Sequence, residues 1–157
     1  MALLGAMMFA AKMALAALPN IEPVTLLVMV YAVVFGRRAL WAIGLYIGLE
    51  AIVWGINVWV VNYIYLWPLL WLIARSLRKM EQPLGWAVLA GFYGAFFGAM
   101  CAPVYVFTNG WAYALSWWIS GIPFDLIHGV GNFAMALVLF APCRKALEHM
   151  KKNLRPL

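Results

Sequence analysis

Long apolar runs separated by short polar or charged connections make up most of the chain. Dividing the sequence at its charges and turn residues predicts six helices, at about 3–18, 23–35, 39–56, 62–78, 84–104 and 122–146. The apolar stretch from 39 to 74 would form about 54 Å of helix, which is too long for one pass through a hydrocarbon core of ~30 Å. We therefore expect the chain to fold back between Asn57 and Asn62.

Two segments near the C-terminal half have their own patterns. The run GFYGAFFGAM in the fifth predicted helix is rich in small residues, which allow a neighbouring helix to approach closely. These are Gly91, Gly94, Ala95, Gly98 and Ala99. The following TNGWAYALSWWISGIP combines turn residues with Trp and Tyr, so we expect a loop and then a short helix lying at a membrane interface.

Composition identifies the solvent of these helices. Hydrophobic residues make up 68% of the 157 positions and charged residues 10%, against about 25% charged in soluble domains. We therefore expect an all-α integral membrane bundle that forms one domain over residues 1–157. The N-terminal run has no basic leader and holds Lys12 inside the apolar stretch, so we expect a retained helix and not a cleaved signal peptide.

Basic residues follow every second predicted helix. They are Arg37, Arg38, Arg75, Arg78, Lys79, Arg144, Lys145, Lys151, Lys152 and Arg155, whereas the connections 19–22, 57–61 and 105–121 contain no Lys or Arg. Because basic connections stay on the cytoplasmic side, this alternation predicts six transmembrane helices with both termini in the cytoplasm. The net charge of +6 then reflects membrane topology and does not indicate a nucleic-acid partner.

Three polar residues lie inside the last apolar run, in GIPFDLIHGVGNF. Asp125, His128 and Asn132 are spaced i, i+3 and i+7, which places them on one face of a helix. Each has a structural explanation: a core histidine bonded to Asp125 or to backbone, an aspartate favouring a helix N-terminus, and an asparagine bonding between helices. Together they favour a ligand-binding stripe.

Other polar groups fall within or between the apolar runs. Lys12 and Glu50 either pair with each other, or Glu50 faces a cavity while Lys12 extends toward the interface. The turn LPNIEPV precedes only thirteen helical residues, fewer than the ~20 of a perpendicular span. It is either a structural connection or a segment that dips inward and offers Asn20 and Glu22 to a site.

Motifs for catalysis and for cofactors are missing from the sequence. There is no Gly-rich phosphate loop, HExxH or GxSxG, and His149 lies in the basic tail, away from His128. Cys101 and Cys143 fall near opposite ends of the predicted bundle, so neither a disulfide nor a metal pair is expected. We expect no enzymatic activity, no metal and no cofactor.

The combination of these features resembles one family. Six short spans, an alanine stripe on the first helix, the LPNIEP turn and above all WWISGIPFDLIHGVGNF resemble the substrate-binding S components of energy-coupling factor (ECF) vitamin transporters. The resemblance covers essentially the whole chain. It implies a subunit of the prokaryotic cell membrane that captures a vitamin or related micronutrient from outside and docks on a transmembrane coupling subunit with two ATPases.

The resemblance also assigns roles to residues. The stripe Ala6, Ala10 and Ala14 matches the family's AxxxA docking face, and helix six lines the family's pocket. Together with the polar and aromatic residues near the outer connections, this gives a predicted substrate site comprising Asn20, Glu22, Glu50, Asn57, Asn62, Trp67, Asn109, Trp117, Asp125, His128 and Asn132.

Further aromatic residues near the outer connections suit a flat, ring-bearing ligand, although anchoring at the membrane interface explains many of them. They are Trp54, Trp59, Tyr63, Tyr65, Tyr105, Trp111 and Trp118. Two other functions stay open. The chain could be a membrane scaffold whose polar groups join helices, or a stand-alone secondary carrier, which would favour inverted repeats.

Overall fold

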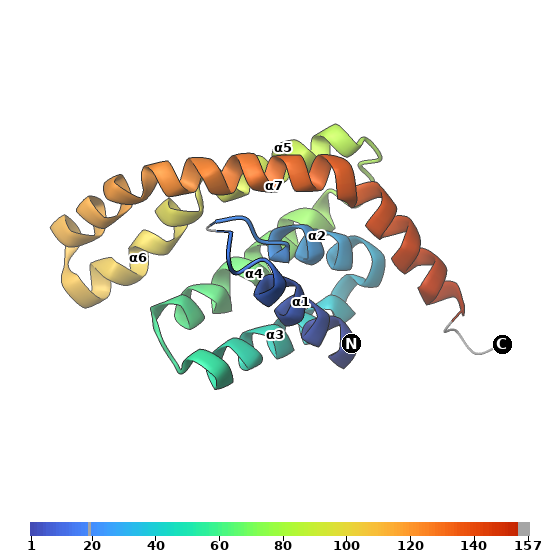
Figure 1. Cartoon of the computed structure of the whole chain (residues 1–157), viewed down its shortest axis with the longest axis horizontal. Helices are drawn as coiled ribbons and strands as arrows, with labels where there is room; N and C mark the ends of the chain where they lie inside the picture. The colour runs from blue at the N-terminus through green and yellow to red at the C-terminus, as the bar shows by residue number, and fades with distance from the viewer. Residues whose placement is uncertain (19, 154–157) are drawn as a thin grey trace.

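The computed structural model describes residues 1–18 and 20–153, and these form an all-helical structure without strands (Figure 1). The elements in order are α1 (Ala2–Ala14), α2 (Val24–Phe35), the 3-10 turn η1 (Gly36–Arg38), α3 (Ala39–Trp54), α4 (Val58–Ser76), α5 (Pro83–Ala95), α6 (Phe97–Asn109) and α7 (Trp111–Asn153).

Four helical stretches are long and apolar enough to cross a membrane. They are Val24–Trp54, Val58–Ser76, Pro83–Asn109 and Trp111–Asn153. The first contains η1, where Gly36 has a φ of 61° and the chain reverses direction between α2 and α3 (Figure 1). A positive φ of this kind is accessible to glycine at little cost. The fold is therefore compatible with a multi-pass membrane protein.

The short helix α2 lies at the centre of the bundle. It contacts α1, α3, α4, α5 and α7, and most of its residues are buried. Around it, the largest buried side chains include Trp67, Trp86 and Phe140, of which Trp86 and Phe140 stack with centroids 4.4 Å apart. Because neighbouring helices enclose α2, its hydrophobic surface is covered by protein and needs no lipid.

Glycines bring α5 and α7 into close contact. A Cβ added to Gly94 would lie 2.9 Å from the backbone of His128, and one added to Gly129 would lie 2.9 Å from the carbonyl oxygen of Gly91. Neither position can hold a larger side chain without a backbone shift. The expectation that small residues of this region allow close helix contact is confirmed.

The single helix predicted over 84–104 is in fact two, because the chain breaks at Phe96 between α5 and α6. Next to this break, the Gly98 N–H donates a hydrogen bond of 3.0 Å to Oδ1 of Asp125 in α7. Pro103 inside α6 also removes one N–H from the helical ladder. A partner 27 residues away thus helps to fix the break, which local sequence could not indicate.

Two predicted boundaries were wrong near the other connections. The first helix ends at Ala14, four residues earlier than expected, and the residues after it form turns. The fourth helix begins at Val58, because the Asn57 side chain caps it by accepting from the Trp59 and Val60 amides at 2.9 and 3.3 Å. The reversal therefore occupies residues 55–57, which include only the first residue of the predicted range 57–62, and Asn62 lies inside α4.

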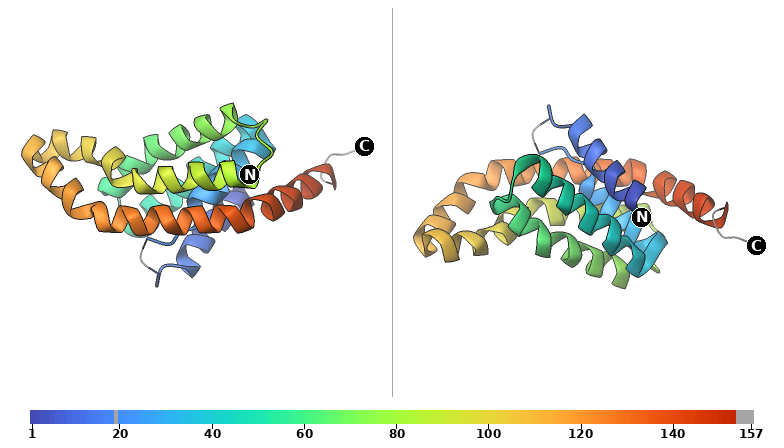
Figure 2. Two further views of the ribbon diagram at one scale, coloured as in Figure 1. Left: turned by 90° about the horizontal axis from the view of Figure 1, so that it is seen from above. Right: turned by 90° about the horizontal axis from the view of Figure 1, so that it is seen from below.

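The expected loop and separate interfacial helix at 108–121 were also wrong. Gly110, with a φ of 86°, makes the whole connection, and residues 111–121 form the start of the 43-residue helix α7. Pro123 lies within this helix without ending it. As a result, α6 and the first part of α7 form a hairpin that projects from one end of the bundle (Figures 1 and 2).

The connections are divided between the two ends of the long axis. The N-terminus, η1, the α4–α5 connection and the C-terminal part of α7 lie toward one end (Figure 1). The α1–α2 and α3–α4 connections and the α6–α7 turn lie toward the other end (Figures 1 and 2). Successive connections thus alternate between the ends.

The glycine contact between α5 and α7 can be tested by a pair of substitutions. Gly94→Ala should lower the free energy of unfolding by about 1–3 kcal/mol, because the new methyl group would overlap the His128 backbone. Gly48→Ala in α3 is the control, since an added Cβ there meets nothing within 4 Å. Unfolding of the purified variants in detergent measures both, and equal stabilities would contradict a tight contact.

Candidate ligand-binding cavity

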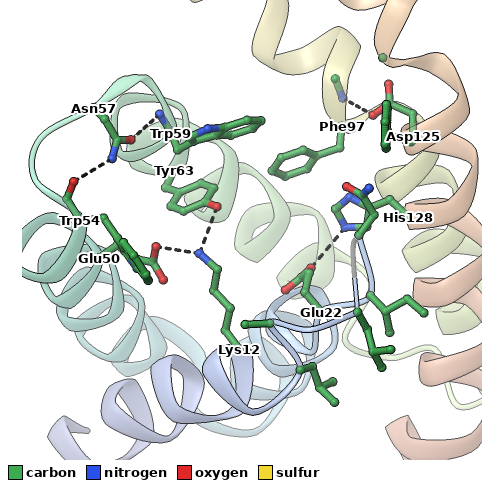
Figure 3. A pocket seen from close by; sticks show the side chains of 18 of the residues that line it. Lys12, Glu22, Glu50, Trp54, Asn57, Trp59, Tyr63, Phe97, Asp125 and His128 are labelled. Atoms are coloured by element: carbon green, nitrogen blue, oxygen red, sulfur yellow. Dashed lines mark hydrogen bonds and ion pairs between the residues drawn. The ribbon is translucent and has the colours of Figure 1, made fainter.

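A cavity of about 990 Å³ opens between α1, α3 and α4 on one side and α6 and α7 on the other (Figure 3). Its size is within the range of small-molecule sites. Its polar lining consists of Lys12, Asn20, Glu22, Glu50, Asn57, Ser116, Ser120, Asp125 and His128. Its aromatic lining consists of Tyr46, Trp54, Trp59, Tyr63, Trp67, Phe97, Tyr113, Trp117 and Phe124.

An ion pair between Lys12 and Glu50 forms part of one wall. The Lys12 ammonium lies 2.7 Å from Oε2 of Glu50 and donates a longer hydrogen bond of 3.5 Å to the Tyr63 hydroxyl. It also lies 5.2 Å from the centre of the Tyr63 ring, within the range of a cation–π contact. Both residues also line the cavity. The sequence left two alternatives, an ion pair or a cavity position for Glu50, and the structure has both.

Glu22 joins the α1–α2 connection to α7 across the opposite wall. Its Oε1 lies 3.3 Å from Nε2 of His128 (Figure 3). The same carboxylate accepts from the Val24 and Thr25 amides and from the Thr25 hydroxyl, which caps the start of α2. The turn therefore brings Glu22 to the cavity, and Asn20 also lines it with a φ of 60°, a conformation that asparagine tolerates.

These contacts determine the charge of Glu22, which lies outside the helices. Burial by itself raises the pKa of the carboxyl, but the hydrogen bond and charge of His128 and the donors of Thr25 and Val24 bring the pKa below its ordinary value. Glu22 is therefore a carboxylate at neutral pH.

Asp125 is held between α6 and α7. The residue is 8% exposed, Oδ1 accepts from the Gly98 amide, and a Cβ on Gly98 would lie 2.4 Å from Oδ2. Only a glycine at position 98 leaves room for this carboxyl group. The carboxyl is fixed in position at the edge of the cavity beside Phe97 (Figure 3).

Several buried polar atoms of the cavity lining lack a hydrogen-bond partner among the described residues. These are Oδ2 of Asp125, Nε1 of Trp67, Oε1 of Glu50 and the hydroxyl of Tyr46. An unpaired buried polar group costs about 1–3 kcal/mol.

Eight of the eleven predicted substrate-site residues line the cavity. They are Asn20, Glu22, Glu50, Asn57, Trp67, Trp117, Asp125 and His128. The predicted sequence stripe is thus divided, since Asp125 and His128 line the cavity and Asn132 does not. One alternative for His128 was a hydrogen bond to Asp125, but its side chain contacts Glu22 instead.

The other three predicted residues lie away from the cavity for separate reasons. The Asn132 amide donates a hydrogen bond of 3.2 Å to the Thr25 hydroxyl and so joins α7 to α2. Asn62 is fully buried in α4, where Oδ1 accepts from the Tyr65 hydroxyl one turn away. Asn109 is at the exposed end of α6, where its Oδ1 accepts from Thr108.

The predicted substrate site omitted Lys12, Tyr46 and Phe97, whereas Trp54, Trp59 and Tyr63, which were expected to suit a ring-bearing ligand, do line the cavity. A charge in an apolar run was a usable signal for Lys12, and Tyr46 precedes Glu50 by four residues and so shares its helix face. Phe97 had no such signal, because its position depends on the break at Phe96. In the part of the chain described, no group of three or more His, Cys, Asp or Glu residues could hold a metal ion.

The alanine stripe of α1 lies on an outer surface. Ala6, Ala10 and Ala14 are exposed, whereas Leu4, Gly5 and Met8 are buried. A Cβ on Gly5 would lie 2.6 Å from the Ala42 carbonyl oxygen, so this buried side approaches α3 closely. The opposite side of α1 is left free for another partner or for lipid.

Comparisons of this chain with protein-family models, with curated proteins and with solved structures found no match. The features of this chain that bear on function are therefore the cavity and the arrangement of the helices.

Proposed function

We propose that this chain is the substrate-binding S component of an ECF-type importer, which captures a ring-bearing micronutrient and delivers it through an ATP-driven coupling module. The observation that carries this proposal is the cavity of about 990 Å³ within an all-helical, apolar bundle. Charged side chains and aromatic rings from six different parts of the chain meet there. Such a mixture suits a polar molecule with a flat ring.

The unpaired atoms favour ligand binding over a scaffold. The Asn132 amide, which joins α7 to α2, is paired with the Thr25 hydroxyl. Among the residues that line the cavity, Trp67 Nε1 and Asp125 Oδ2 have no hydrogen-bond partner within the described residues, and away from the cavity neither does Asn62 Nδ2. Most of the unpaired buried polar atoms in the described part of the chain thus belong to the cavity lining, which supports a site for a small polar molecule.

The division of the connections supports a six-pass topology with both termini in the cytoplasm. Arg37 and Arg38 lie in η1, Arg78 and Lys79 lie between α4 and α5, and these connections are at the same end as the N-terminus and the C-terminal part of α7 (Figure 1). The α1–α2, α3–α4 and α6–α7 connections at the opposite end have no basic residue. The positive-inside rule then places that end outside the cell membrane.

The energy for uptake is expected to come from partners. The sequence contains no nucleotide-binding motif, and the exposed side of α1 offers a row of small residues. Such rows permit close approach of another membrane helix. In this proposal Ala6, Ala10 and Ala14 contact a transmembrane coupling subunit that is associated with two ATPases.

His128 and Asn132 provide a matched test of the cavity, since both are buried polar residues of α7. His128→Ala should raise the dissociation constant of the bound molecule roughly tenfold to hundredfold, because it removes a cavity group and leaves Glu22 without its partner. Asn132→Ala should lower the melting temperature and leave the dissociation constant within about twofold. The probe is the small molecule that co-purifies with the protein, identified by native mass spectrometry and titrated back.

Two results would count against this site. Equal losses of affinity in both variants would indicate a general effect on folding. A protein that co-purifies with nothing and binds no member of a vitamin panel would favour the scaffold.

The docking surface can be tested separately from the cavity. Ala10→Trp and Ala14→Trp should abolish cellular uptake of the same molecule, because a bulky ring prevents close helix contact, and should leave its affinity for the purified protein nearly unchanged. Val138→Trp is the control, since Val138 is 68% exposed on α7. Parallel loss of uptake and affinity in the α1 variants would mean that the stripe is internal packing.

Orientation can be measured by labelling single cysteines in intact cells, after Cys101 and Cys143 are replaced by alanine. Ile56→Cys in the α3–α4 connection, where Ile56 is 87% exposed, and Asn109→Cys should react with an impermeant maleimide. Arg78→Cys should react only after the cells are opened. Labelling of Arg78→Cys from outside would reverse the topology and contradict an outward cavity.

A further inference from the structure

The charges of the cavity do not balance. Among the described residues that line the cavity, Glu22, Glu50 and Asp125 are the three carboxyl groups, and Lys12 is the one cation that is positive at every physiological pH. His128 adds at most one more positive charge. With all three carboxyl groups ionised, the lining is therefore negative in either state of the histidine. A net charge in a site of low dielectric constant favours a counter-ion.

The three carboxyl groups differ in how far protein donors satisfy them. Glu22 accepts from two amides and a hydroxyl and contacts His128, and Glu50 has Lys12 at 2.7 Å. Asp125 has one amide donor on Oδ1 and no charged partner within hydrogen-bond distance in the described part of the chain, and its Oδ2 is unpaired. At 8% exposure it is the least compensated acid of the cavity.

Aromatic rings extend from the Lys12 wall toward Asp125. The Tyr63 and Trp67 centroids are 5.4 Å apart, those of Trp67 and Phe97 are 5.6 Å apart, and those of Phe97 and His128 are 5.1 Å apart. Phe97 immediately precedes the Gly98 amide that holds Asp125. A planar ring placed against Phe97 and Trp67 would thus have its edge near the Asp125 carboxyl, and aromatic faces also attract cations.

From this arrangement, and resting on the proposed capture function, we propose that the cavity selects a cationic ring compound whose ammonium or protonated ring nitrogen lies beside the Asp125 carboxyl group and balances its charge. The excess negative charge could instead be removed by a proton on Asp125. A protonated Asp125 would favour a neutral ligand, so the charge of the ligand that binds most tightly distinguishes a cationic ligand from a protonated Asp125.

The test uses the full chain in lipid nanodiscs and compounds that share a ring and differ in charge. Pyridoxamine carries an ammonium group, pyridoxine a neutral hydroxymethyl group and 4-pyridoxate a carboxylate at the same ring position. Thiamine, riboflavin and biotin extend the cationic, neutral and anionic classes to other rings. Tryptophan fluorescence and calorimetry give a dissociation constant for each compound. We expect at least one cation to bind about tenfold or more tightly than the neutral and anionic compounds.

Asp125→Asn identifies the residue responsible. It preserves an oxygen acceptor for the Gly98 amide and the shape of the side chain, so the melting temperature of the empty protein should change little. The preference for a cation should fall to about threefold or less. Glu81→Gln is the control, because Glu81 is exposed between α4 and α5 and its loss changes the net charge equally. It should leave the preference unchanged.

Each result has a distinct meaning. Tightest binding of a neutral or anionic compound, or a cation preference that survives in Asp125→Asn, would overturn the charge inference and leave the capture function intact. Binding of no compound, together with no co-purified molecule, would overturn the capture function and the charge inference together.

Discussion

Titratable side chains inside a bundle with an apolar exterior need partners, and the contacts that they make connect the whole structure. Lys12 and Glu50 join α1 to α3, Glu22 and His128 join the α1–α2 connection to α7, and Asp125 joins α7 to the backbone of α6. Removing one member of a buried pair leaves an uncompensated charge, which is far more costly than the pair itself. The same three contacts surround the cavity, so the groups that fix the helices also form the candidate site.

Much of the helical pattern could be predicted from the sequence, because apolar runs between charged or turn residues are a local signal. The bounds of α2 and α3 were predicted within two residues. The break at Phe96 could not be predicted, since it is accompanied by a hydrogen bond from Gly98 to a carboxylate 27 residues away. The continuation of α7 through Pro123 was missed for a related reason, because a proline weakens a helix but packing decides whether the helix ends. The number of passes and their orientation stay predictions.

The candidate site was predictable where a polar residue interrupts an apolar run, as Glu50, Asp125 and His128 do. Which partner each one meets was not predictable, because this depends on how helices approach in space. His128 contacts Glu22, 106 residues earlier, and Asn132 on the same helix face bonds to Thr25 beyond the cavity. Aromatic residues gave the weakest signal, because Trp, Tyr and Phe are equally suited to a lipid-facing surface, a packed core and a ligand site.

The shortness of α2 changes the barrier that a solute meets. Its 12 residues rise only about 18 Å, whereas the hydrocarbon core is about 30 Å thick. If one end of α2 meets a headgroup layer, the other end stops roughly 12 Å short of the opposite layer. Glu22 caps the N-terminal end of α2, which is the end that stops short in this arrangement. With α2 placed in this way, a solute resting against Glu22 would lie about two-fifths of the way across the hydrocarbon core, without any movement of the helices.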